Sequence, residues 1–284
     1  MVKDRHPILS AYSWLNALSI DVCAGAIAGG TMASVLLDTN IAWAYWLILP
    51  IAVWLIYTAD HLIDGYRTMN RRAHFRHNFH HKNYRSLILI SILLAIIAAL
   101  LSFSYLPYEV IIFGIALGGL AVIYLALVFA APGILSVFFQ KELLVALFYT
   151  AGIWGPVIIM NQGIGIDHAL ILLIFLLVAY QDLIMLSMIE IKADSTAGQG
   201  SFPISFGYRR SRVLFYAIAA TVFSLALIAI LYYPDALILK AALVLALMQG
   251  GLILIFRFAS KLHHADLYRY LSEALFFMPA LMLL

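Results

Sequence analysis

The chain has 284 residues, of which 65% are hydrophobic and only 11% are charged, and its mean hydropathy is +1.01. Soluble domains carry about 45–50% apolar and about 25% charged residues. This composition therefore excludes a cytosolic enzyme, a disordered protein and a nucleic-acid binder with a broad basic face. The net charge is only +3, and a single cysteine, Cys23, excludes a framework of disulfides. A membrane protein with several spans remains.

Nine segments are long and apolar enough to cross a bilayer, which takes about 20 residues of helix. They cover residues 12–37, 41–59, 86–105, 109–131, 143–161, 165–189, 211–233, 236–256 and 267–284. The strands of a membrane barrel would alternate apolar and polar residues, and a run such as Leu87–Leu101 does not alternate. No cleavable signal peptide is visible, because the first apolar stretch is long enough to span. The sequence predicts one all-α integral membrane domain over residues 1–284, with nine transmembrane helices.

The positive charges indicate how the predicted spans are oriented. With the N-terminus inside, sixteen of the 17 Lys and Arg residues fall on the cytoplasmic side, and only Lys240 falls outside. The connections on the cytoplasmic side are also the longer ones, notably residues 60–85 and 190–211, and long polar loops usually carry function. We therefore expect the N-terminus and the active site to face the cytoplasm, at the inner membrane if the protein is bacterial.

Two pairs of carboxylates end the second and the sixth predicted span. The first pair is Asp60 and Asp64, and the second is Glu190 and Asp194. A spacing of four residues puts both side chains of a pair on one face of a helix. The pairs also occupy matching places in two sets of four spans, which indicates a weak internal duplication. Crowded carboxylates repel one another unless a cation neutralises them, and Mg²⁺ prefers a few carboxylates together with substrate phosphates.

Basic residues in the same loops suit the remaining phosphate oxygens. Acid pairs, nearby bases and an apolar bundle together suit an amphiphile with an anionic head and an apolar tail, such as a polyprenyl diphosphate. The alternative is that each pair is only a solvated helix end. The matched positions of the two pairs favour a functional site over two solvated helix ends.

At these residues the chain resembles the UbiA superfamily of intramembrane prenyltransferases, which has nine helices and acidic motifs ending helices 2 and 6. Residues 190–207, with their acid pair and later Gly, Pro and Gly, resemble the second motif. The first acid pair with Arg67 resembles the first motif. Lys141, followed by Tyr149 and Gly152, resembles the region that supplies a phosphate-binding lysine. The resemblance covers nearly the whole chain in topology but only about forty residues in motif.

Two positions depart from the family pattern. The first motif usually opens with Asn four residues before its first Asp, where this chain has Ile56, which cannot ligate a metal. The second motif opens with Glu190 in place of Asp, which still offers carboxylate oxygens. Together these departures indicate a divergent branch or a changed reaction.

The resemblance implies a Mg²⁺-dependent enzyme that ionises an isoprenoid diphosphate and transfers the prenyl group to a lipophilic, aromatic type of acceptor. The implied catalytic residues and metal ligands are Asp60, Asp64, Glu190 and Asp194. The expected substrate-binding residues are Arg67, Arg71, Lys141, Tyr149, Tyr180 and Asp182. Two alternatives stay open: a terpene cyclase of the same superfamily that acts on the diphosphate alone, and a non-catalytic or transport protein of this fold. The expected partners are these substrates and membrane lipid, without nucleic acid or an obligatory protein partner.

Aromatic and acidic residues within the spans extend this site. Rings such as Tyr57, Tyr149, Trp154 and Tyr180 suit a carbocation, although ordinary packing explains each of them as well. Asp182 precedes Glu190 by eight residues on one helix, so it either faces the same cavity or is protonated or bonded to a neighbouring helix. Asp21 and Glu273 also lie within predicted spans and stay unassigned.

A histidine-rich loop offers a different reading. His77-x-x-His80-His81 matches one histidine box of membrane di-iron desaturases and hydroxylases. Such centres draw histidines from several boxes, and only His263-His264 forms another pair on this side. A basic amphipathic cap that touches lipid headgroups or covers the site is therefore the favoured interpretation of residues 71–82.

Overall fold

The computed structural model describes residues 7–67, 75–130, 140–198, 200–263 and 266–284. At positions 7–11, 64–67, 75–78, 130 and 197 it describes the backbone but not the side chain. Of the predicted site residues, Arg71 therefore lies outside the described residues, and Asp64 and Arg67 are placed by their backbone only.

Helices make up the fold, and the described residues contain no strand, which confirms the predicted all-α class. The helices are α1 (Pro7–Ala17), α2 (Ile20–Leu36), α3 (Tyr45–Arg67), α4 (Phe75–Lys82), α5 (Tyr84–Tyr105), α6 (Tyr108–Ala130), α8 (Lys141–Met160), α9 (Ile166–Ile189), α10 (Ile191–Ala197), α11 (Phe202–Phe206), α12 (Tyr208–Tyr232), α13 (Ala236–Arg257), α14 (Ala259–Leu262) and α15 (Leu267–Leu275), followed by the 3₁₀ helix η2 (Met278–Leu283).

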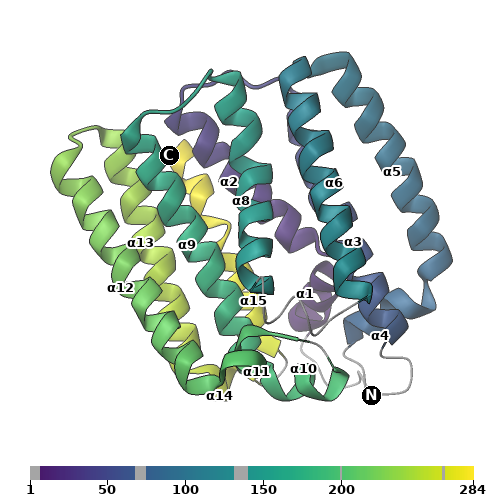
Figure 1. The fold of residues 1–284 in the computed structure, drawn as a ribbon. Helices are drawn as coiled ribbons and strands as arrows, with labels where there is room; N and C mark the ends of the chain where they lie inside the picture. The colour runs from purple at the N-terminus through teal and green to yellow at the C-terminus, as the bar shows by residue number, and fades with distance from the viewer. Residues whose placement is uncertain (1–6, 68–74, 131–139, 199, 264–265) are drawn as a thin grey trace.

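Seven helices of the described residues are long and apolar enough to cross a membrane: α3, α5, α6, α8, α9, α12 and α13. They form a bundle, and the short helices α4, α10, α11 and α14 gather at one end of it, with α1 beside them (Figure 1). We call this the short-helix end. The apolar spans are those of a multi-pass integral membrane protein. The side of the membrane that the short-helix end faces stays a prediction.

The first predicted span, residues 12–37, is not one helix, and this part of the prediction is wrong. α1 ends at Ala17, Ser19 has a left-handed φ of 54°, and α2 starts at Ile20. The side chain of Asp21 receives a hydrogen bond from the Asn16 amide (2.7 Å) and another from the backbone N–H of Val22 (3.0 Å). Side chains of this type compete with the helical backbone bonds, so the polar run breaks the span. The 17 residues of α2 reach about 26 Å, slightly less than the hydrocarbon core of a bilayer.

The last predicted span, residues 267–284, is also interrupted. α15 has nine residues, and the chain then continues as the 3₁₀ helix η2, which begins next to Pro279. Proline lacks the backbone N–H that an α-helix needs. The predicted total of nine spans is therefore not confirmed, because seven helices of the described part of the chain meet the length and two predicted spans are broken.

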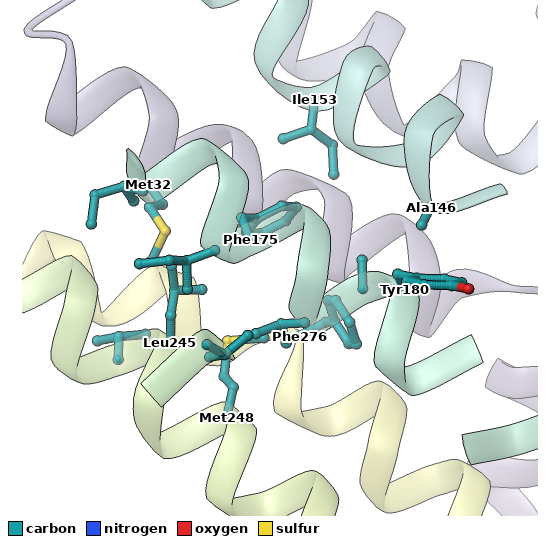
Figure 2. Close-up of a cluster of buried hydrophobic side chains, with 14 of the residues drawn as sticks. Met32, Ala146, Ile153, Phe175, Tyr180, Leu245, Met248 and Phe276 are labelled. Carbon is teal, nitrogen blue, oxygen red and sulfur yellow. The ribbon is translucent and has the colours of Figure 1, made fainter. Parts of the chain in front are cut away.

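α9 lies at the centre of the core and packs against α8, α12 and α13. Its Phe175 lies among Met32 of α2, Ile153 of α8 and Leu245 of α13 (Figure 2). The hydroxyl of Tyr45 on α3 donates to the carbonyl of Ile153 over 2.9 Å, which ties α3 to α8. Helices from both ends of the sequence thus meet around α9.

The close approach of α2 to this core depends on Gly29. A Cβ at this position would lie 3.0 Å from Phe175 Cζ and 3.2 Å from Ile153 Cγ2. We expect Gly29→Val to lower the free energy of unfolding by about 1–3 kcal/mol, because overpacking forces neighbouring side chains from their rotamers. Thermal unfolding in detergent measures this. The control is Gly250→Ala on α13, where a Cβ meets nothing within 4 Å and stability should not fall. Equal stability of both variants would contradict the close approach.

Candidate active site

A cavity of about 90 Å³ lies between α1, α2, α3, α8, α9 and α15. Its described polar lining residues are Asn16, Ser19, Tyr57, Tyr149, Asp182, Arg269 and Glu273, and its apolar ones are Val22, Val145, Ala146, Ala179, Leu183, Leu186 and Phe276. Ser19 reaches the cavity from the break between α1 and α2, so the interruption of the first span helps to build it.

On three helices, the side chains that line this cavity lie on one face of the helix. On α9, Asp182 and Leu186 are four residues apart, and on α15 Arg269 and Glu273 have the same spacing, so each pair shares one face. On α8 the lining positions are Val145, Ala146 and Tyr149. Two of the predicted substrate-binding residues, Tyr149 and Asp182, therefore line one cavity, as does the previously unassigned Glu273.

Glu190 holds an ion pair that the sequence did not indicate. Arg269 Nη2 donates to Glu190 Oε1 (2.5 Å) and Oε2 (2.6 Å), and the hydroxyl of Tyr268 donates to Oε1 (2.8 Å). Both charged side chains are 16% exposed. Arg269 also lines the cavity, so the pair connects the second acidic motif to the cavity wall. The available signal was an arginine just past the start of the last predicted span, because ionisable residues in spans are usually functional.

Asp194 lies on α10 at the short-helix end, in an environment that disfavours its charge. Burial, and then the neighbouring carboxylate of Glu190, raise the pKa of Asp194 to about 6, although Lys141 and Arg269 act in the opposite direction. Lys141, the predicted phosphate-binding lysine at the start of α8, is thus within electrostatic reach of the second acid pair. The crowding of acids that motivated the metal prediction is therefore present at this pair.

The first acid pair lies near the end of α3 towards the short-helix end. Asp60 is half-buried, three residues beyond Tyr57 of the cavity wall and therefore on nearly the same face. The side chain of Asp64 lies outside the described part of the chain. That the two pairs face one another across one cavity thus stays a prediction. No group of three or more His, Cys, Asp or Glu side chains converges as a metal site within the described residues.

Two aromatic residues proposed for the site lie elsewhere. Tyr180 is not among the described residues that line the cavity, and its hydroxyl donates to Gln140 Oε1 over 2.6 Å. Trp154 is fully buried in the core, with its ring 6.1 Å from that of Phe175. Both residues fit the packing interpretation.

The histidines split between two environments. His80 of α4 is buried, with its ring 4.9 Å from that of His61 on α3, whereas His81 is exposed. His61 Nδ1 also lies 3.5 Å from Ser19 Oγ of the cavity wall. Because His80 is buried and its neighbour His81 is exposed, the two side chains do not ligate one metal centre together. The arrangement instead packs α4 against α3, and the cap over residues 71–82 stays a prediction, because its side chains up to residue 78, with His77 among them, and that of His264 lie outside the described ones.

Solved structures have the same fold. A UbiA homologue from Archaeoglobus fulgidus matches with a TM-score of 0.64 and 13% identity, over 95% of this chain and 98% of its own. An apo UbiA homologue from Aeropyrum pernix K1 matches with a TM-score of 0.61 and 14% identity, over 93% and 97%. A structure concerned with digeranylgeranylglyceryl phosphate synthase in membranes matches with a TM-score of 0.55 and 15% identity, over 96% and 97%.

No protein-family model matches the sequence, and no curated protein matches it either. The structural matches cover nearly all of this chain and of each matched chain. The chain therefore has the UbiA fold, and the resemblance found in the sequence is confirmed at the level of the fold.

Proposed function

We propose that this protein is a Mg²⁺-dependent intramembrane prenyltransferase that ionises an isoprenoid diphosphate and transfers the prenyl group to a lipophilic acceptor. The observation that carries the proposal is a half-buried acid pair, Glu190 and Asp194, beside Lys141 and the wall of a cavity inside an apolar bundle. The likeness in fold to a digeranylgeranylglyceryl phosphate synthase structure supports the same class of reaction.

The donor set fits Mg²⁺, which takes oxygen ligands and tolerates few protein contacts. Asp60, Asp64, Glu190 and Asp194 would hold it. Glu190 fits although Arg269 and Tyr268 donate to it, because carboxylate oxygens carry further lone pairs and ligating carboxylates are usually hydrogen-bonded in this way. When bound, the ion would neutralise the diphosphate and so stabilise the leaving group.

The side chains of the chain itself would perform the remaining tasks. Lys141, Arg67 and Arg71 would bind phosphate oxygens and complete the neutralisation. The apolar wall formed by residues such as Ala146 and Phe276 would exclude water, which would otherwise quench a carbocation. The ring faces of Tyr57 and Tyr149 in the cavity wall would stabilise that cation without reacting.

Purified protein in lipid vesicles, incubated with radiolabelled geranylgeranyl diphosphate, tests this proposal. With a lipid extract of the native membrane as the source of acceptor, we expect a prenylated product that disappears when EDTA removes Mg²⁺. The Asp235→Asn variant, altered at the N-cap of α13, is the matched control and should remain active, because Asn also caps helices well.

The other outcomes identify the alternatives. A cyclic hydrocarbon or alcohol formed without extract would assign the protein as a terpene cyclase, for which the Ile56 departure already leaves room. An intact diphosphate after incubation with Mg²⁺ and extract would refute an enzyme of either kind.

A further inference from the structure

The carboxyl group of Asp182 lies in the cavity wall with an unused hydrogen-bonding atom. Asp182 is only 5% exposed and lines the cavity from α9. Ser272 of α15 lies beside the carboxyl group, but Oδ1 has no hydrogen-bond partner among the described residues. An unsatisfied buried polar atom destabilises the folded protein, because it has lost its hydrogen bonds to water. A ligand group that donates a hydrogen bond in the cavity would remove this cost.

The charges of the wall restrict what that ligand can be. Asp182 and Glu273 are acids, and the charged base that lines the same cavity in the described residues, Arg269, already pairs with Glu190. An anionic group in the cavity would therefore face two acids and an arginine whose charge is largely compensated. Since electrostatic interactions are strong where water is excluded, an anion is disfavoured and a neutral or cationic donor is favoured.

The size and the surroundings of the cavity agree with a small polar head on an apolar molecule. Its volume of about 90 Å³, about that of three water molecules in the liquid, suits a small headgroup better than a prenyl tail. Ala146 and Phe276 of its wall belong to the hydrophobic core (Figure 2). The apolar remainder of a ligand would meet side chains of this kind.

We propose that this cavity binds the acceptor substrate through a hydrogen-bond-donating hydroxyl or amino group, received by Asp182 Oδ1, and that it rejects acceptors whose headgroup is a carboxylate or another anion. The identification of the ligand as the acceptor substrate rests on the proposed function. The binding preference itself is a property of the cavity and holds without turnover.

Ligand-observed NMR titrations of the full chain in detergent test the preference, with prenyl diphosphate left out. The probes are phenol (a neutral donor), benzylamine (a cationic donor), benzene (no donor) and benzoate (an anion), each corrected for binding to empty micelles. We expect phenol and benzylamine to bind at least about tenfold more tightly than benzene, and benzoate more weakly than benzene, because each matched hydrogen bond or charge is worth about 1.4 kcal/mol or more.

Two variants assign the preference to Asp182. Asp182→Leu should reduce phenol affinity to that of benzene, and Asp182→Asn, which keeps the size and an acceptor oxygen, should mainly weaken benzylamine binding. The matched control is Asp167→Asn at the opposite end of α9, which should change neither affinity. If the Leu variant does not fold, benzylamine binding to the Asn variant decides the assignment.

Equal affinities of phenol and benzene for the unaltered protein, or tighter binding of benzoate, would overturn the proposal, as would unchanged benzylamine binding in Asp182→Asn. Failure of the enzyme assay is a separate result, because the titrations contain no diphosphate and require no Mg²⁺. If the protein bound phenol but transferred no prenyl group, the proposed binding site would stand and the proposed function would be refuted.

Discussion

Asn in place of Asp194, or of Asp60, is expected to reduce prenyl transfer by about 10²–10³-fold, the loss that follows removal of one group which stabilises developing charge. Each change keeps the size of the side chain but removes the negative charge that would hold Mg²⁺. The main effect should be on kcat, with a shift of the Mg²⁺ dependence to higher concentration. Initial rates with labelled geranylgeranyl diphosphate over a Mg²⁺ series measure both quantities.

The stability of Asp194→Asn distinguishes a functional from a structural carboxylate. The pKa of Asp194 is raised from 3.8 to about 6, so the folded protein binds this proton more tightly than the unfolded chain does. Ionisation of this group therefore lowers stability as the pH rises from about 4 to 6, and the cost persists above that range. In the absence of metal, the Asn variant should be at least as stable as the unaltered protein at pH 7. Normal turnover would show that Asp194 has no catalytic role, and a large loss of stability together with activity would show that it serves the fold.

Hydrophobic segments of the sequence predicted the architecture because a bilayer demands long apolar helices. Segments such as 86–105 and 165–189 correspond closely to α5 and α9. Hydropathy averaged over a span does not register a single break, so the left-handed Ser19 and the 3₁₀ turn at η2 were missed. The cause of the first is a side-chain contact, the bond from Asn16 to Asp21, and the cause of the second is the single residue Pro279; neither changes the average hydropathy of the span.

The site was predictable where it is local in sequence and not where it is assembled by packing. The spacing of Glu190 and Asp194 is visible in the chain, and so is the ionisable Asp182 in an apolar helix. The partner of Glu190 is Arg269, 79 residues further on. Nothing in periodicity specifies which distant helix supplies that charge. The cavity has the same origin, because its wall combines α1 and α2 with α15.

Arg269→Ala is expected to cost about 3 kcal/mol of stability, near the lower end of the range for breaking a buried ion pair. The two side chains are 16% exposed, so water would compensate little of the charge left on Glu190. Asp194 is close enough to add repulsion. A loss of this size should lower the unfolding temperature in detergent by several degrees, and turnover should fall because Glu190 loses a group that orients it.

The double variant Arg269→Met, Glu190→Gln separates these two effects. Replacement of both partners by neutral side chains of similar volume removes the unpaired charge, so stability should return close to that of the unaltered protein. Activity should not return, because the carboxylate proposed to hold Mg²⁺ is gone. A double variant with normal turnover would show that the pair only stabilises the fold. If Arg269→Ala unfolded at the same temperature as the unaltered protein, the charge of Glu190 would not need Arg269 to neutralise it. The ion pair would then not link the second acidic motif to the cavity wall.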